Sequence, residues 1–156
     1  MKDFPARPAK PVEAGRSGVL NLRLRMPFDG SRNERSLIMK LVRYNKVLDE
    51  ENSLTYLPDF LDAAKMLIAK RRTGTFNVVC AGGISPYRIM ELYREIVDPA
   101  HVFERLTVET LGSVVTAGRS NCMLSTEKLK GEGIALRPVA EAVREALECL
   151  KHLSVS

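Results

Sequence analysis

Hydrophobic and polar side chains alternate from Val19 to Met26. The apolar face of this stretch consists of Leu20, Leu22, Leu24 and Met26, and the polar face carries Asn21, Arg23 and Arg25. A period of two residues predicts a β-strand, and we expect Pro27 to end it because proline has no amide hydrogen for the ladder. A second strand is predicted over residues 75–79, where Thr, Phe and Val side chains lead into a glycine-containing turn.

Apolar positions recur at helical spacing in four other stretches. The pattern predicts amphipathic helices over residues 33–44 and 58–70, a third helix that begins at Pro86 and a fourth that begins at Pro138. Ser85 stands directly before Pro86, where its hydroxyl is expected to cap the third helix. Strands that alternate with helices indicate an α/β protein.

The two strands predicted at residues 19–26 and 75–79 are too few for a complete doubly wound sheet. Weaker strand signals lie at residues 47–48, 54–57 and 114–116. The connection between the two confident strands contains a helix and is long enough for parallel pairing. We therefore expect these strands to be neighbours in a larger sheet, of which this chain supplies a part.

The first 18 residues differ in composition from the rest of the chain. Three prolines and two glycines without an apolar period predict an irregular arm over residues 1–18. Residues 19–153 form the expected folded region.

Composition excludes several classes of protein. The chain has 156 residues, 45% of them hydrophobic, and no stretch approaches the roughly 18 apolar residues of a membrane-spanning helix. A net charge of +5 is a modest basic bias, and without a nucleic-acid-binding motif we expect no nucleic-acid partner. Three cysteines without a CxxC pair and only two histidines predict no metal site and a reduced, cytoplasmic compartment.

Short motifs follow one another in a distinctive order along residues 19–150. They are Leu22–Pro27, Gly74–Asn77 with Gly82 and Ser85, Met90–Tyr93, Val97–Pro99, Arg119–Asn121, Leu124 and Lys128–Leu129. Their order and spacing resemble the carboxy-terminal half of extended short-chain dehydrogenases. In particular they resemble the nucleotide-rhamnose synthases, which are NDP-4-keto-6-deoxyglucose 3,5-epimerase/4-keto-reductases related to dTDP-4-dehydrorhamnose reductase.

The resemblance implies a fold, an activity and a ligand. The fold would be a partial Rossmann-like sheet that carries the small, mostly helical substrate domain. The activity of the parent family is the NADPH-dependent reduction of a nucleotide-linked 4-keto-6-deoxyhexose after epimerisation. The expected ligand is a nucleotide-diphosphate sugar, with the choice between UDP and dTDP open.

Seven residues match family positions near the ligands. The loop after the first strand lies beside the nicotinamide in such relatives, so Met26, Pro27 and Phe28 are predicted to contact the cofactor; alternatively, Pro27 only ends the strand. Arg119, followed by Ser120 and Asn121, matches a position near the nucleotide sugar in relatives, where a guanidinium could make a bidentate contact with the diphosphate; the alternative is a surface arginine in a loop. Asn77 matches an asparagine that closes the second strand, in either a substrate-binding or a structural role.

Two family motifs are absent from these 156 residues. No tyrosine is followed by lysine four positions later, and Gly82–Gly83 lacks the third glycine of a dinucleotide-binding turn. We therefore expect no catalytic residue in this chain and no NADPH binding by the chain alone. Three interpretations stay open: the substrate-binding portion of an enzyme whose amino-terminal Rossmann half lies elsewhere, a non-catalytic regulatory or interaction module, and a truncated gene product. A homo-oligomer is compatible with each.

Overall fold

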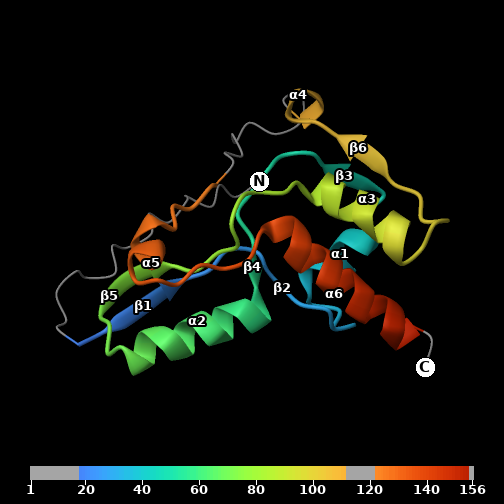
Figure 1. Ribbon diagram of the computed structural model, residues 1–156. Helices are drawn as coiled ribbons and strands as arrows, with labels where there is room; N and C mark the ends of the chain where they lie inside the picture. The colour runs from blue at the N-terminus through green and yellow to red at the C-terminus, as the bar shows by residue number, and fades with distance from the viewer. Residues whose placement is uncertain (1–17, 112–121, 155–156) are drawn as a thin grey trace, which may run out of the picture.

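The computed structural model describes residues 18–111 and 122–154 (Figure 1). The predictions for residues 1–17 and for a strand at 114–116 lie outside these residues. The strands are β1 (Leu20–Arg23), β2 (Pro27–Phe28), β3 (Lys46–Leu48), β4 (Thr55–Tyr56), β5 (Gly74–Asn77) and β6 (Glu104–Leu106). The helices are α1 (Leu37–Val42), α2 (Leu57–Ala69), α3 (Pro86–Ile96), α4 (Val108–Leu111), α5 (Glu127–Gly131) and α6 (Val139–Ser154). The arrangement is mixed α/β, as predicted.

The strands form three parallel pairs within the described residues. β1 pairs with β5, β2 with β4 and β3 with β6. The register of the first pair places Leu22 opposite Phe76, which confirms that the two confident strands are parallel neighbours. The weaker signals at residues 47–48 and 54–57 correspond to β3 and β4.

The first strand is shorter than predicted, and Pro27 does not end it. β1 stops at Arg23, and the backbone N–H of Arg25 turns away to donate to the Thr55 hydroxyl at 3.0 Å. Pro27 instead opens β2, opposite Thr55 of β4. The first position of a two-residue strand needs no amide hydrogen, so proline is tolerated there.

Local capping explains where the helices begin. The Ser85 hydroxyl accepts a hydrogen bond from the N–H of Arg88 at 3.1 Å, which confirms the predicted cap of α3. The helix predicted over residues 33–44 is shorter, because the Asn33 carbonyl accepts from Ser36 and its side chain from Arg35 in a tight turn before α1. α2 begins at Leu57, one residue earlier than predicted.

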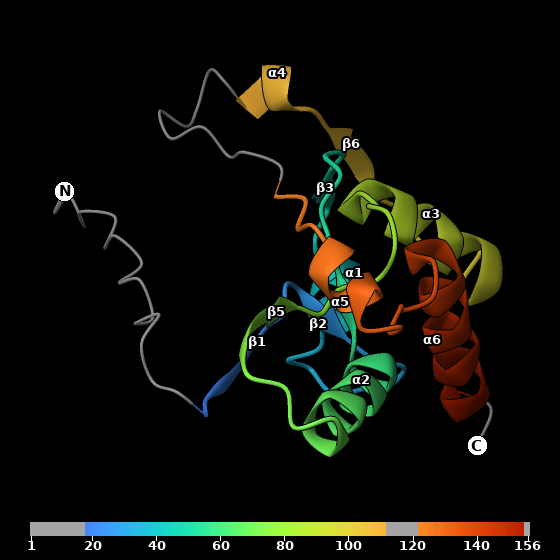
Figure 2. The ribbon, with the colours of Figure 1, turned by 60° about the vertical axis from the view of Figure 1, so that its left-hand side comes forward.

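Two buried clusters hold the molecule together. In the first, α1, α3 and α6 pack around side chains such as Ile38, Met90 and Leu147. In the second, α2 covers the β1–β5 pair through Leu67 and Phe76. Figure 2 shows α6 alongside α3, with α2 below the paired strands. The carboxyl ends of β1 and β5 lie between the two clusters, and the candidate site begins there.

Candidate functional site

A groove of about 610 Å³ opens beside the connection between β1 and β2. It is lined by that connection, by α1, by β3 and by the segment after β3, with Met26, Tyr44, Leu48 and Asn52 among its walls. We call it the Met26 groove. Ligands of parallel α/β sheets bind outside the carboxyl ends of the strands, and this groove lies at such an end.

Met26 has an unusual backbone conformation at the groove. Its φ is +43°, in the left-handed region that a side chain other than glycine or asparagine seldom adopts. Such backbone strain persists where surrounding contacts impose it, and it is concentrated at functional sites. Here the left-handed conformation of Met26 turns the chain from β1 into β2, and the Met26 side chain lies in the groove wall.

Thr55 holds this turn in place through two hydrogen bonds. Its hydroxyl accepts from the N–H of Arg25 and donates to the carbonyl of Val78, both at 3.0 Å. Thr55 is fully buried, so both hydrogen bonds are shielded from water. The Met26 loop is therefore attached directly to the end of β5.

Asn52 joins three further segments on the side of the groove. Its Oδ1 accepts from Arg25 Nη2 at 2.7 Å and from the N–H of Cys122 at 3.2 Å. Its Nδ2 donates to the carbonyl of Glu50 at 3.2 Å. Next to it, the Ser53 hydroxyl accepts from the N–H of Leu124 at 2.9 Å. Asn52 is only 9% exposed, so this is a buried and well-satisfied amide.

The predicted cofactor contacts occupy three different environments. Met26 lines the groove, and Pro27 is exposed at the start of β2. Phe28 is 1% exposed and its ring packs on Tyr56 with 5.2 Å between centroids. The side chain of Phe28 thus fills the core, and Met26 is the one of the three that lines the groove.

Of the four predicted substrate contacts, Asn77 lies within the described residues. Asn77 Nδ2 donates to the carbonyl of Ser125 at 2.8 Å, which attaches the end of β5 to the segment before α5. This hydrogen bond is a structural contact, and the substrate-binding alternative for Asn77 stays a prediction. Arg119, Ser120 and Asn121 lie outside the described residues.

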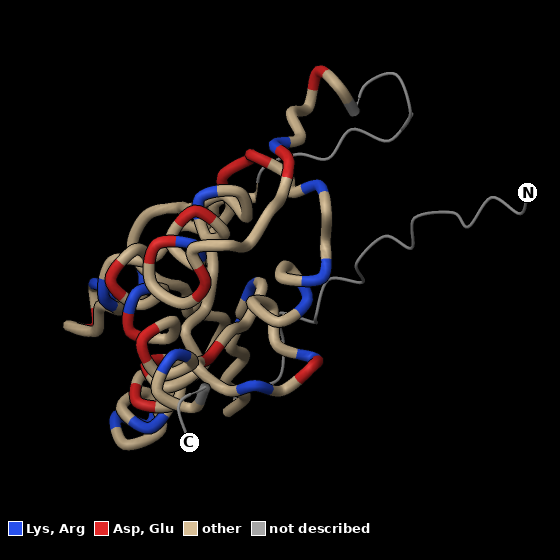
Figure 3. Tube along the Cα trace, turned by 90° about the vertical axis from the view of Figure 1, so that its right-hand side faces the viewer, with Lys and Arg blue, Asp and Glu red and all other residues tan. Residues whose placement is uncertain are grey.

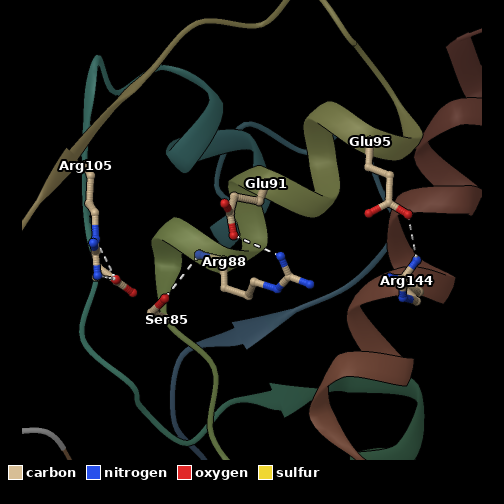
Figure 4. A network of polar contacts seen from close by, with 7 residues as sticks. Ser85, Arg88, Glu91, Glu95, Arg105 and Arg144 are labelled. Carbon is tan, nitrogen blue, oxygen red and sulfur yellow. Dashed lines mark hydrogen bonds and ion pairs between the residues drawn. The ribbon is translucent and has the colours of Figure 1, made fainter.

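A second cavity, of about 660 Å³, lies at the amino-terminal end of α3. We call it the Ser85 cleft, and Figure 4 shows its polar walls. Its charges are largely paired with one another or with nearby residues; the contacts are Arg88–Glu91 at 2.9 Å, Arg144–Glu95 at 3.3 Å and Arg105 Nε–Asp49 at 2.8 Å. Hydrogen bonds from Ser85 and Arg105 hold the pKa of Asp49 below its usual value. The network joins α3, α6 and the β3–β6 region and leaves little charge for a ligand.

Three buried or partly buried groups, Tyr56, Tyr93 and Cys80, have a pKa above the ordinary value of their side chains. Burial, with the Glu145 contact, raises the pKa of Tyr56, and burial also raises the pKa of Tyr93. Burial likewise raises the pKa of the Cys80 thiol, which makes it a poorer nucleophile. These groups stay protonated at neutral pH.

Residues 18–111 and 122–154 contain neither a metal-binding cluster nor a membrane-spanning helix. No group of His, Cys, Asp or Glu side chains in these ranges is arranged to hold a metal ion. In the same ranges no helix is long and apolar enough to cross a membrane. Figure 3 shows Lys and Arg interleaved with Asp and Glu along the trace.

Sequence reasoning missed Arg25, Asn52 and Ser53. The alternating pattern placed Arg25 on the outer face of a continuous strand, whereas the strand ends before it. Asn52 and Ser53 follow the acidic run 49–51, which suggests a solvated loop. An asparagine two residues before the predicted strand at 54–57 was the one available signal of a buried amide.

Known proteins resemble this chain in sequence and in fold. It is 36% identical over 126 residues to the bifunctional dTDP-4-dehydrorhamnose 3,5-epimerase/dTDP-4-dehydrorhamnose reductase of Arabidopsis thaliana, a match that covers 80% of this chain and 42% of the relative. The crystal structure of the UDP-rhamnose synthase from Acanthamoeba polyphaga mimivirus matches with a TM-score of 0.74 and 32% identity, over 84% of this chain and 46% of that one. No family model matches the chain.

More distant structures share the fold alone. RMD from Pseudomonas aeruginosa, solved with NADPH, has a TM-score of 0.61 and 16% identity, over 87% of this chain and 48% of that one. The structural neighbours are Rossmann-type reductases and epimerases, so the α/β prediction of a partial Rossmann-like sheet is confirmed. This chain spans less than half the length of the curated relatives cited above. The chain corresponds to a part of the proteins of the nucleotide-rhamnose synthase and dTDP-4-dehydrorhamnose reductase family.

Proposed function

We propose that this chain is the substrate-binding portion of an NADPH-dependent reductase/epimerase that acts on a nucleotide-linked 4-keto-6-deoxyhexose in rhamnose synthesis. The observation that carries the proposal is the similarity over four fifths of the chain to relatives named as rhamnose epimerase/reductase and UDP-rhamnose synthase. The Met26 groove, at the carboxyl end of β1, supplies the binding site that this function needs.

The groove has the chemistry to hold a nucleotide. Apolar walls from α1 and β3 offer a surface for a flat base, and the Tyr44 ring, 54% exposed, stands at the rim. Two cationic side chains, of Arg25 and Lys46, also line it. Ligand sites of this kind combine an apolar body with a few polar groups that fix orientation.

The chemical step divides between this chain and a Rossmann unit outside these residues. The reaction moves a hydride from NADPH to the C4 carbonyl carbon of the sugar and a proton to the carbonyl oxygen. These 156 residues hold neither a Tyr-x-x-x-Lys pair nor a dinucleotide-binding glycine turn. We assign hydride and proton delivery to an amino-terminal half, in the same polypeptide or in a partner. This chain binds and orients the nucleotide sugar and completes the pocket at Met26.

The same absences favour a second function, that of a non-catalytic regulatory or interaction module. Such a module would keep the fold and the ion-pair network between α3 and α6 and would have no use for the groove. Ligand binding therefore separates the two functions.

Isothermal titration of the protein with UDP, dTDP, ADP and NADPH tests the proposal. We expect UDP or dTDP to bind more tightly than ADP, which has the diphosphate but a different base, and NADPH to give no signal. Of UDP and dTDP, the nucleotide that binds with the higher affinity identifies the base that the protein recognises. The proposal is wrong if UDP and dTDP give no heat above ADP. Micromolar NADPH binding would contradict the division of the chemistry.

A further inference from the structure

Arg25 carries an uncompensated charge in the groove wall. It is partly buried, and no carboxylate lies within ion-pair distance of it among the described residues. Its Nε is buried and has no hydrogen-bond partner in that part of the chain. Withdrawing a guanidinium from water without an anionic partner is costly, and an anion that enters the groove removes the cost.

The guanidinium is nevertheless held in place. Asn52 Oδ1 accepts from Nη2 at 2.7 Å, and the backbone N–H of Arg25 is bound to Thr55. Because Asn52 is neutral, it fixes the direction of the guanidinium without cancelling its charge. A planar guanidinium that is oriented in advance binds a phosphate with little further loss of side-chain entropy.

The other charges of the groove do not compete for this role. Lys46 Nζ pairs with Glu104 at 3.3 Å. The Glu50 carboxylate also lines the groove, and it weakens rather than provides anion binding. The cation left for an anionic ligand is Arg25.

We propose that Arg25 is the anion-binding residue of the Met26 groove and that Asn52 is its positioning residue. The anion is a phosphate group of the ligand, and this inference rests on the proposed function because it places the diphosphate of the nucleotide in the same groove.

The experiment compares UDP, uridine and inorganic pyrophosphate as probes of the wild type and of variants. Arg25→Gln removes the charge and keeps a polar side chain that is too short to take the place of Nη2 beside Asn52. We expect it to weaken UDP and pyrophosphate binding by about tenfold to a hundredfold and to leave uridine binding unchanged. Arg23→Gln, an exposed position of β1 outside the groove, is the matched control and should behave as the wild type.

Asn52 is tested by the ratio of UDP affinity to uridine affinity. We expect Asn52→Ala to lower this ratio about threefold to tenfold. The double variant Asn52→Ala/Arg25→Gln should have the same ratio as Arg25→Gln alone, because both changes act on the same interaction between Arg25 and the phosphate. A merely structural role would lower the affinities for UDP and uridine together. Asn52→Asp keeps an acceptor for Arg25 but adds a negative charge that compensates the guanidinium, so it should also lower the ratio.

The outcomes separate this inference from the proposed function. If UDP binds wild type and Arg25→Gln equally, the inference is wrong and the proposed function stands. If pyrophosphate binding depends on Arg25 but UDP and dTDP bind no more tightly than pyrophosphate, the inference stands and the nucleotide function is wrong. If none of the three probes binds the wild type, both are wrong.

Discussion

Individual arginines of this chain differ in what surrounds their charge. Arg137 has a fixed role: Asp59 accepts two hydrogen bonds from it at 2.8 Å, and its guanidinium lies 5.3 Å from the centre of the Tyr56 ring. The hydrogen bonds with Asp59, opposed in part by burial, raise the pKa of Arg137. Among residues 18–111 and 122–154, the side chain of Arg25 has only a neutral partner, Asn52. The paired arginine stabilises the fold, and the unpaired one remains available for a ligand.

Arg119 is a third case, and its role is predicted from its family position. That position is near the nucleotide sugar in relatives, and a guanidinium there could make a bidentate contact with the diphosphate. A hydrogen bond to a charged group contributes roughly 1.5 to 3 kcal/mol, so we expect Arg119→Ala to weaken UDP or dTDP binding by about one to two powers of ten. Arg119→Lys should restore part of the affinity, because an ammonium lacks the planar geometry of the guanidinium.

The melting temperature distinguishes the two interpretations of Arg119. A binding role predicts an unchanged melting temperature in Arg119→Ala, while a surface arginine that stabilises its loop predicts a lower melting temperature with unchanged affinity. Equal affinities of wild type and Arg119→Ala would remove Arg119 from the site.

At the scale of elements, helices with capping signals were predictable and short strands were not. Ser85 and Pro86 together specify where α3 begins, since one accepts an unpaired helix N–H and the other has no N–H to satisfy. The end of β1 depends on a contact with Thr55, 30 positions further along the chain, which no local pattern encodes. For the same reason the groove itself was not predictable: Asn52 and Arg25 meet only in three dimensions.

The cap of α3 gives a stability prediction. Ser85→Ala should lower the free energy of unfolding by about 0.5 to 2 kcal/mol, because it removes the acceptor for the N–H of Arg88. It also removes the hydrogen bond that lowers the pKa of Asp49. A carboxyl whose folded pKa is depressed adds stability above its unfolded pKa, and this stability is lost as the pH falls through the folded value.

Urea unfolding of wild type and Ser85→Ala at two pH values checks this account. The difference in unfolding free energy should be larger at pH 7 than at an acidic pH below the folded pKa of Asp49, where its carboxyl is protonated in both proteins. A difference in unfolding free energy that does not change with pH would mean that the hydrogen bond from Ser85 to Asp49 does not contribute to stability.

At the scale of the whole molecule, the sheet is narrow for a Rossmann-type protein. β1 pairs with β5 on one side, through the carbonyls of Val19 and Arg23, and has no strand on its other side among the described residues. The relatives are about twice as long as this chain. An open edge of a parallel sheet is a place where another strand can pair.

We therefore expect the isolated protein to self-associate or to pair with a partner through β1. Static light scattering over a range of concentrations should give a mass that rises above that of a monomer. A stable monomer at high concentration would show that the edge of β1 is protected.

The central claim is that the Met26 groove binds the nucleotide of a nucleotide sugar. The most direct measurement is the change in backbone amide chemical shifts when UDP or dTDP is added to the isotope-labelled protein. We expect shifts that concentrate at Met26, Tyr44 and Leu48, with Glu91 and Arg144 of the Ser85 cleft unchanged. Shifts confined to the Ser85 cleft, or no shifts with either nucleotide, would contradict it.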